Sequence, residues 1–262
     1  LLVAHCFQLI AFYSLHIAFN SLLEAFMNQT VLVIAAHPDD EVLGCGGTIA
    51  RHAAEGDTVH ILIMAEGLTS RDQTRDAEAR QSELSALAQT AHQAGNVLGA
   101  SSVELLAFPD NRMDSLALLD VVKEVEARMA NLQPSIVYTH HAGDLNIDHQ
   151  ITHKAVVTAC RPYPDQPVRT LFFFEVPSST DWQVPGTEAP FTPNWFVDIS
   201  GCAADGKTFG AKKIQALELY ESEMRSFPHA RSLEAVEHLA RWRGASVGKE
   251  HVEGFMLGKH LV

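Results

Sequence analysis

The segment VLVIAAHPDDE, residues 31–41, decides the fold class of this chain. Its first six residues form a continuous apolar run rich in β-branched side chains, which is typical of a parallel strand buried on both faces. A polar loop, a glycine cluster at 44–47 and a helical segment at 48–55 follow directly. This order predicts the first strand, loop and helix of a βα unit.

The same alternation continues along the chain. Strands are predicted at 58–65, 103–108, 135–139 and 171–176, and helices at 71–94, 115–131, 148–160, 212–224 and 232–243. The stretch 177–195, rich in Pro and aromatic residues, is expected to be a long surface loop. Repeated βα units predict an α/β, Rossmann-like, mostly parallel sheet with helices on both faces. Because ligands of such sheets bind beyond the carboxyl ends of the strands, we expect the active site there.

Residues 1–26 differ from the rest of the chain because they are apolar and contain no Lys or Arg. A secretory signal needs a basic start and a small-residue cleavage site, and neither is clear here. No basic residues flank the segment as they flank a membrane span. We predict one catalytic domain over residues 27–262. The preceding extension is either an amphipathic or weak membrane helix that contacts a membrane, or a result of where the chain was taken to start.

Composition limits the classes of function. The chain has 262 residues, 47% of them hydrophobic, which suits one large α/β domain and excludes wholesale disorder. Its net charge of −13 argues against a nucleic-acid partner, since a phosphate backbone attracts basic surfaces. Four Cys without a C-x-x-C pair argue against a disulfide scaffold or a thiolate zinc site, and fit a cytoplasmic location. Apolar surface on the C-terminal helices would permit a homo-oligomer.

Acidic and imidazole side chains cluster after two of the predicted strands. The first cluster is HPDDE, 37–41, and the second is HHAGDLNIDH, 140–149. Carboxylates packed this closely repel one another unless a cation neutralises them. His and Asp without thiolates suit a catalytic Zn²⁺ with three protein ligands and an open position for water, although another divalent metal would also fit.

Two other interpretations of these motifs need to be weighed. Asp39 or Asp40 could simply cap a helix, but two such clusters at the carboxyl ends of parallel strands favour a metal site. The glycines at 44–47, with Glu66 at the end of the second strand, could indicate a nucleotide-cofactor-binding oxidoreductase. Their spacing is not G-x-G-x-x-G, and the acidic HPDDE loop would repel a pyrophosphate. We therefore interpret the glycines as sites of close packing.

AAHPDDEVLGCGGTIA, 35–50, followed by DLNIDHQITH, 144–153, closely resembles the PIG-L / LmbE-like family of zinc-dependent N-deacetylases, over roughly residues 31–174. The resemblance implies a zinc hydrolase that removes an acetyl group from an N-acetylated amino sugar or sugar conjugate. It implies Asp39 as the general base. The family's metal ligands correspond to His37, Asp40 and His149. Its sugar-binding positions correspond to Arg71 and Asp110.

One position departs from the family pattern. This chain has Asn146 where the family commonly has a His that stabilises the oxyanion and protonates the leaving amine. Asn can donate a hydrogen bond to an oxyanion but cannot deliver a proton. We expect His141 to act as the acid because it follows the strand end. The alternatives are a proton shuttle by Asp39 and an acid role for His153, which lies one helical turn after His149 and could also replace it as a ligand.

The expected mechanism uses water activated by the metal. Asp39 takes the proton of the water that attacks the amide, Asn146 or His141 stabilises the oxyanion, and Glu41 orients a ligand imidazole. The expected partner is a small molecule or glycoconjugate. The rival functions are a zinc amidase for a non-sugar or thiol-conjugate amide, the oxidoreductase above, and a sugar-binding protein without catalysis.

Overall fold

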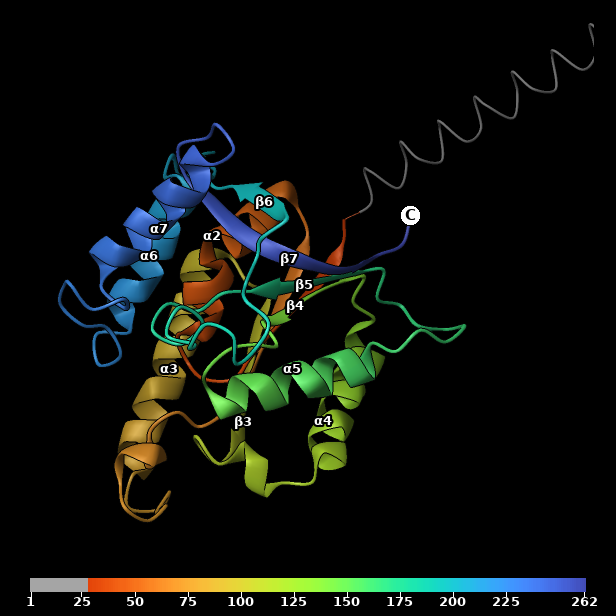
Figure 1. Ribbon diagram of the computed structural model, residues 1–262, viewed down its shortest axis with the longest axis vertical. Coiled ribbons are helices and arrows are strands. Elements are labelled where there is room, and N and C mark those ends of the chain that lie inside the picture. The colour runs from red at the N-terminus through yellow and green to blue at the C-terminus, as the bar shows by residue number, and fades with distance from the viewer. Residues whose placement is uncertain (1–27) are drawn as a thin grey trace, which may run out of the picture.

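The described part of the chain, residues 28–262, forms one seven-stranded sheet in the computed structural model (Figure 1). The predictions for residues 1–26 lie outside the described residues. The strands are arranged in the order β3 (Ser102–Phe108), β2 (Thr58–Ala65), β1 (Thr30–Ala35), β4 (Ile136–His140), β5 (Thr170–Phe174), β7 (Val252–His260) and β6 (Trp195–Asp198). The strands from β3 to β5 are parallel, and β7 and β6 add antiparallel pairs at one edge.

Helices cover both faces of the sheet, and each face has its own apolar core (Figure 1). One face carries α2 (Asp40–Glu55), α3 (Gln81–Leu98), α6 (Phe209–Leu219) and α7 (Leu233–Ala245). The other face carries α4 (Leu118–Leu132) and α5 (Ile147–Ala159). Two short 3-10 helices follow β2 and β3, at Thr69–Arg71 and Met113–Ser115. The predicted α/β, mostly parallel, Rossmann-like architecture is confirmed.

The sheet order explains why two distant segments meet. β1 has β2 on one side and β4 on the other, so the direction of strand addition reverses between β1 and β4. Val31 pairs with Ile136 and Val33 with Tyr138, in parallel register. The chain therefore leaves both strands at the same edge, where HPDDE and HHAGDLNIDH lie side by side. Such a switch point is where open α/β sheets bind ligands.

The glycine cluster lies inside α2, which begins at Asp40 and not near residue 48 as predicted. The acidic Asp40 and Glu41 in its first turn favour an earlier start, because they face the positive end of the helix dipole. A Cβ on Gly44 would overlap the Phe174 ring, and one on Gly47 would lie 2.8 Å from Ile199 Cγ2. The glycines thus permit close packing of α2, as we expected. They form no phosphate-binding turn, so this feature does not support a dinucleotide site.

One other prediction was wrong in detail, and two strands were missed. α3 begins at Gln81 and not at residue 71, because Asp side chains organise the preceding segment as a loop. Arg80 binds the Asp72 carboxylate at 2.7–2.8 Å, and Asp76 accepts the Ala79 N–H at 2.9 Å. β6 and β7 were not predicted, since neither has the long apolar run of the parallel strands.

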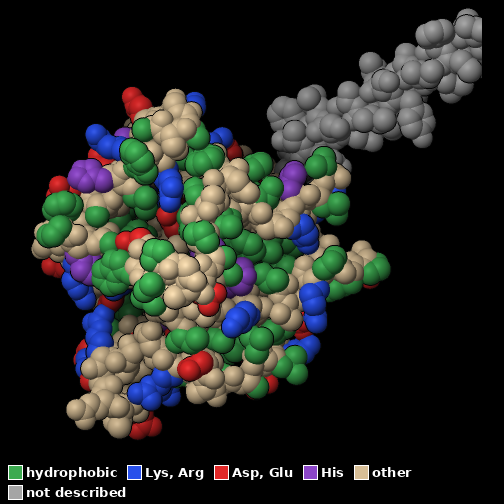
Figure 2. All heavy atoms as spheres, in the orientation of Figure 1, with side chains coloured by type: hydrophobic (Ala, Val, Ile, Leu, Met, Phe, Trp, Pro, Cys, Tyr) green, Lys and Arg blue, Asp and Glu red, His purple; other side chains and the backbone are tan. Residues whose placement is uncertain are grey.

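Charged, polar and apolar side chains are mixed on the face of the molecule shown in Figure 2. Lys and Arg side chains are scattered among acidic, polar and apolar ones on this face and form no continuous basic area. Within residues 28–262, none of the helices has the length and hydropathy needed to span a membrane.

Candidate metal site and active site

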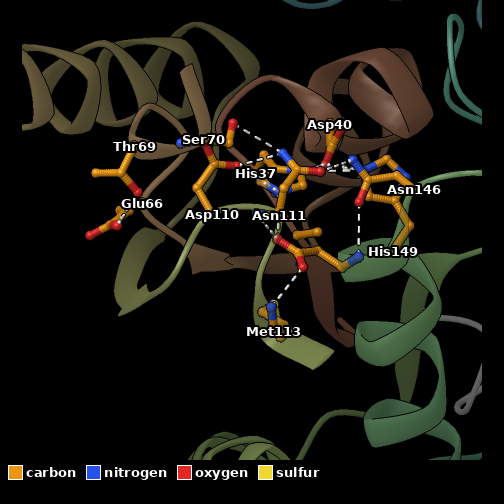
Figure 3. Close-up of polar contacts among 12 residues, drawn as sticks. His37, Asp40, Glu66, Thr69, Ser70, Asp110, Asn111, Met113, Asn146 and His149 are labelled. Carbon is orange, nitrogen blue, oxygen red and sulfur yellow. Dashed lines mark hydrogen bonds and ion pairs between the residues drawn. The ribbon is translucent and has the colours of Figure 1, made fainter. Parts of the chain in front are cut away.

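Three side chains converge at the carboxyl ends of β1 and β4. His37 Nδ1 lies 3.2 Å from Asp40 Oδ2 and 3.3 Å from His149 Nε2, and His149 Nε2 lies 3.1 Å from Asp40 Oδ2. Figure 3 shows these side chains pointing toward one another from the loop after β1, the start of α2 and the start of α5. The three residues that the resemblance implied as ligands are therefore brought together.

The geometry of this triangle fits a zinc ion. Ligand atoms that bind one Zn²⁺ tetrahedrally at about 2.0–2.1 Å lie about 3.3 Å from one another. The three separations in the structure, 3.1–3.3 Å, match that value. Two imidazole nitrogens and one carboxylate oxygen are also the donor types that Zn²⁺ uses in catalytic sites. These residues can therefore hold a metal.

Carboxylates hold the opposite nitrogen of each imidazole. His37 Nε2 lies 3.0 Å from Asp148 Oδ2 and 3.3 Å from Asp110 Oδ1, so His37 lies between Asp40 and Asp110 (Figure 3). His149 Nδ1 lies 3.1 Å from Asp144 Oδ1. Such partners fix the tautomer and orientation of a metal-binding imidazole.

The prediction that Glu41 orients a ligand imidazole was wrong. Its carboxylate instead accepts the Asp39 N–H at 3.1 Å and the Tyr220 hydroxyl at 2.6 Å. Glu41 follows Asp40 in the first turn of α2, and its buried side chain contacts Tyr220, the residue after α6, rather than the imidazoles. Burial raises the pKa of Glu41 to about 7, although its hydrogen bonds oppose the shift.

The charges of the cluster stabilise one another. Burial disfavours charge on His149, but Asp40 and Asp144 outweigh that effect and raise its pKa to about 9. Burial likewise opposes charge on Asp40, yet His149 and His37 hold its pKa well below the ordinary value. Proton binding to His149 therefore competes with the binding of a metal ion.

Asp39 lies beside the triangle and lines a cavity of about 200 Å³ together with His37, Asp40 and His149. Its side chain is 2% exposed, and Arg231 Nη1 lies 3.2 Å from Asp39 Oδ2. Burial and the neighbouring Asp40 raise the pKa of Asp39 well above its ordinary value, and Arg231 opposes the shift. A bound cation would reverse this balance and favour the ionised carboxylate.

Arg71 and Asp110 both line the same cavity. Arg71 Nη2 lies 2.7 Å from both oxygens of Glu223, and 41% of the arginine side chain is exposed. Asp110 is buried and accepts the Ser70 N–H at 3.0 Å, besides its contact with His37. The structure thus places both residues next to the triangle.

Asn146 and the two histidines considered for the acid role lie in different surroundings. Asn146 lines the cavity, its Oδ1 accepts the Asp148 N–H at 2.8 Å as the N-cap of α5, and its Nδ2 donates to Asn111 Oδ1 at 2.9 Å. The structure does not bring His141 or His153 to the cavity. His141 Nε2 lies 2.8 Å from the Ala189 carbonyl, and His153 Nδ1 lies 2.9 Å from the His140 carbonyl.

Sequence reasoning assigned no role to four residues that shape the site. Asp144 and Asp148 were recognisable as carboxylates beside His149 in the chain, but nothing in the sequence paired them with particular nitrogens. The His140 ring stacks on that of His149 with 3.9 Å between the ring centroids, and its Nε2 accepts the Ala36 N–H at 2.8 Å. Arg231 lies 192 residues after Asp39, and no local signal connects them.

Removing the charge of Asp144 is expected to weaken metal binding. In Asp144→Asn, Oδ1 can still accept from Asn146 N, and the new amide can donate to Thr180 Oγ1, so the fold should survive. Loss of the carboxylate that orients a metal-binding imidazole typically costs about 10–100-fold in affinity. A competition titration with a chromophoric chelator measures the change. An unchanged affinity would show that Asp144 does not orient His149.

Metal affinity is expected to depend on pH. Because the pKa of His149 in the metal-free protein is raised from 6.5 to about 9, a metal ion must displace a proton at every pH below about 9. Release of the His149 proton alone lowers the apparent affinity about tenfold for each unit that the pH falls, and the raised pKa of His37 makes the dependence steeper. The apparent Kd for Zn²⁺ should be measured between pH 6.5 and 9. A pH-independent Kd would contradict the assignment of His149.

Comparisons with known proteins agree with this arrangement. The family model described as GlcNAc-PI de-N-acetylase (PIG-L) matches residues 32–160, which include both loops of the site. The chain is 27% identical over 197 residues to the uncharacterized deacetylase YaiS of Escherichia coli K12, covering 73% of this chain and 90% of that protein. The predicted enzyme class, N-deacetylase, is confirmed by these matches.

Two solved structures share the fold at low identity. N,N′-diacetylchitobiose deacetylase from Pyrococcus horikoshii has a TM-score of 0.68 at 19% identity, covering 93% of this chain and 92% of its own. GalB, the 4-carboxy-2-hydroxymuconate hydratase of Pseudomonas putida KT2440, has a TM-score of 0.68 at 23% identity, covering 89% and 98%. Since a deacetylase and a hydratase share this architecture, the fold alone does not decide the reaction. The family match and the His/Asp site together show that the chain carries, over residues 32–160, a domain of the PIG-L family of de-N-acetylases.

Proposed function

We propose that this protein is a zinc-dependent hydrolase that removes the acetyl group from an N-acetylated amino sugar or sugar conjugate. The observation that carries the proposal is the triangle of His37 Nδ1, Asp40 Oδ2 and His149 Nε2 beside the Asp39 carboxylate in one cavity. The family match supports the acetylated amino sugar as the substrate class.

His37, Asp40 and His149 would hold the zinc ion. When bound, zinc lowers the pKa of a water molecule toward about 7 and polarises the amide carbonyl. Asp39 accepts the proton of the attacking water, since its carboxylate lines the cavity beside the ligands. Arg231 favours the ionised form of that carboxylate.

Asp39 also returns the proton to the leaving amine. His141 and His153 bind backbone carbonyls outside the cavity. The amide of Asn146 can donate a hydrogen bond but cannot transfer a proton. Among the described residues that line the cavity, Glu223 is held by Arg71, and Asp110 accepts a backbone N–H. We therefore transfer the acid role expected of His141 to Asp39. The second hydrogen of Asn146 Nδ2 serves as a donor to the oxyanion.

Arg71 and Asp110 bind the sugar. Arg71 offers guanidinium hydrogens at the exposed side of the cavity, and Asp110 offers carboxylate oxygens at the buried side next to His37. Donors and acceptors on opposite sides of a polar cavity suit the hydroxyl groups of a hexosamine. The substrate is a small molecule or glycoconjugate.

Acetate release tests the proposal. The protein is stripped with a chelator, reloaded with Zn²⁺ and incubated with N-acetylglucosamine, N,N′-diacetylchitobiose or N-acetylcysteine. We expect acetate from at least one of the two sugars, no acetate from the stripped protein, and recovery on reloading. Acetate from N-acetylcysteine alone would replace the sugar by a thiol-conjugate amide as the substrate class. No acetate from any of the three would refute the proposed activity.

A further inference from the structure

The backbone of Asp39 has a conformation that a non-glycine residue rarely adopts. Its φ is 107° and its ψ is −30°, at the residue that precedes α2. Residues persist in such conformations only where their surroundings hold them, and they are common at functional sites. The Asp39 carbonyl accepts the N–H groups of Val42 and Leu43 at 3.1 and 2.8 Å, as the start of the helix requires. The carbonyl is therefore held by the helix itself.

The Asp39 N–H is held by a different group. It donates to Glu41 Oε2 at 3.1 Å. The Glu41 side chain is 1% exposed, and in the described part of the chain it forms no ion pair with a Lys or Arg. A buried carboxylate is costly unless hydrogen bonds stabilise it. An acidic residue that only interacts with the helix dipole could lie at the surface. The burial of the Glu41 carboxylate therefore indicates a further role.

Tyr220 supplies the second hydrogen bond to Glu41. Its hydroxyl donates to Glu41 Oε1 at 2.6 Å, and the residue is fully buried just after α6, which packs beside α2 (Figure 1). Tyr220 also begins the segment 220–231, whose last residue is Arg231, the partner of the Asp39 carboxylate. Both ends of this segment thus act on Asp39. Arg231 contacts the Asp39 carboxylate directly, and Tyr220 contacts Glu41, which accepts the Asp39 N–H.

We propose that Tyr220 is a positioning residue for deacetylation: through Glu41 it holds the Asp39 peptide in the conformation that directs the carboxylate into the cavity. The proposal rests on the proposed role of Asp39 in proton transfer. Tyr220 lies beyond residues 32–160, so the family match does not include it. A positioned acid–base group loses rate when it moves, because proton transfer depends steeply on donor–acceptor distance.

Tyr220→Phe tests the proposal because it removes one hydroxyl and keeps the ring that fills the core. We expect kcat for acetate release to fall about 10–100-fold on whichever of N-acetylglucosamine and N,N′-diacetylchitobiose the wild type deacetylates, with KM and bound zinc unchanged. Tyr138→Phe is the matched control, since Tyr138 is also buried and its hydroxyl lies 3.0 Å from His52 Nε2, away from the cavity. Glu41→Gln should lower kcat similarly, and the double variant should lose no more than the more affected single variant.

A second measurement is independent of catalysis. Hydrogen exchange of the Asp39 amide, followed by NMR, should accelerate at least tenfold in Tyr220→Phe and remain unchanged in Tyr138→Phe. If the wild-type protein releases no acetate, the proposed function fails, whereas the exchange rates still decide whether Tyr220 holds Asp39. A kcat within twofold of wild type, an equal loss in Tyr138→Phe, loss of zinc or unchanged exchange would each overturn the proposal.

Discussion

Asp39→Asn is expected to lose nearly all deacetylase activity while it retains the metal. Asp39 is not part of the His37, Asp40 and His149 triangle, so its charge is not needed to hold the ion. We expect kcat to fall about 10³–10⁴-fold, at the upper end for one acid–base group, because Asp39 serves both proton transfers. Steady-state kinetics and metal analysis of the same preparation measure the two quantities.

The choice of Asn removes an ambiguity in this experiment. Asn and Asp tolerate positive φ better than other non-glycine residues, so the backbone at φ 107° should survive. Asp72→Asn is the control, because Asp72 binds Arg80 outside the cavity and should keep full activity. A kcat within threefold of wild type in Asp39→Asn, with zinc bound, would remove Asp39 from the chemistry.

His149→Ala is expected to lose the metal and with it the activity. Only two ligands would remain, and affinity should fall by more than the 10–100-fold that loss of a ligand's hydrogen-bond partner costs. His153→Ala is the matched control, since His153 lies one turn later on α5 and its ring contacts the His140 carbonyl and the Phe173 ring. We expect near-stoichiometric zinc in His153→Ala and less than about a tenth of that in His149→Ala.

His37→Ala should behave like His149→Ala, because each removes one corner of the triangle. Zinc content by elemental analysis and the melting temperature of each variant separate loss of the ligand from loss of the fold. Full zinc occupancy in His149→Ala together with its loss in His153→Ala would transfer the ligand role to His153.

Several features of the molecule were predictable from local patterns. The apolar run 31–36 and its successors predicted buried parallel strands, because short continuous apolar runs rich in β-branched residues are typical of strands covered on both faces. His and Asp at two strand ends predicted that both loops meet, because parallel strands leave the sheet at one edge. The antiparallel strands β6 and β7 were not predictable in this way, since neither has the long apolar run of the parallel strands.

The sequence by itself determined the fold class and the edge of the sheet where the His and Asp side chains gather, and its resemblance to a family pointed to three candidate metal ligands. Only the tertiary structure decided which carboxylate pairs with which imidazole and that His141 contacts the Ala189 carbonyl. It also decided that Arg231 contacts Asp39 and that Tyr220 contacts Glu41, both from the C-terminal part of the chain. The physical reason is that strand direction and apolar periodicity are properties of short segments. A hydrogen bond between residues almost 200 positions apart depends instead on how whole helices pack.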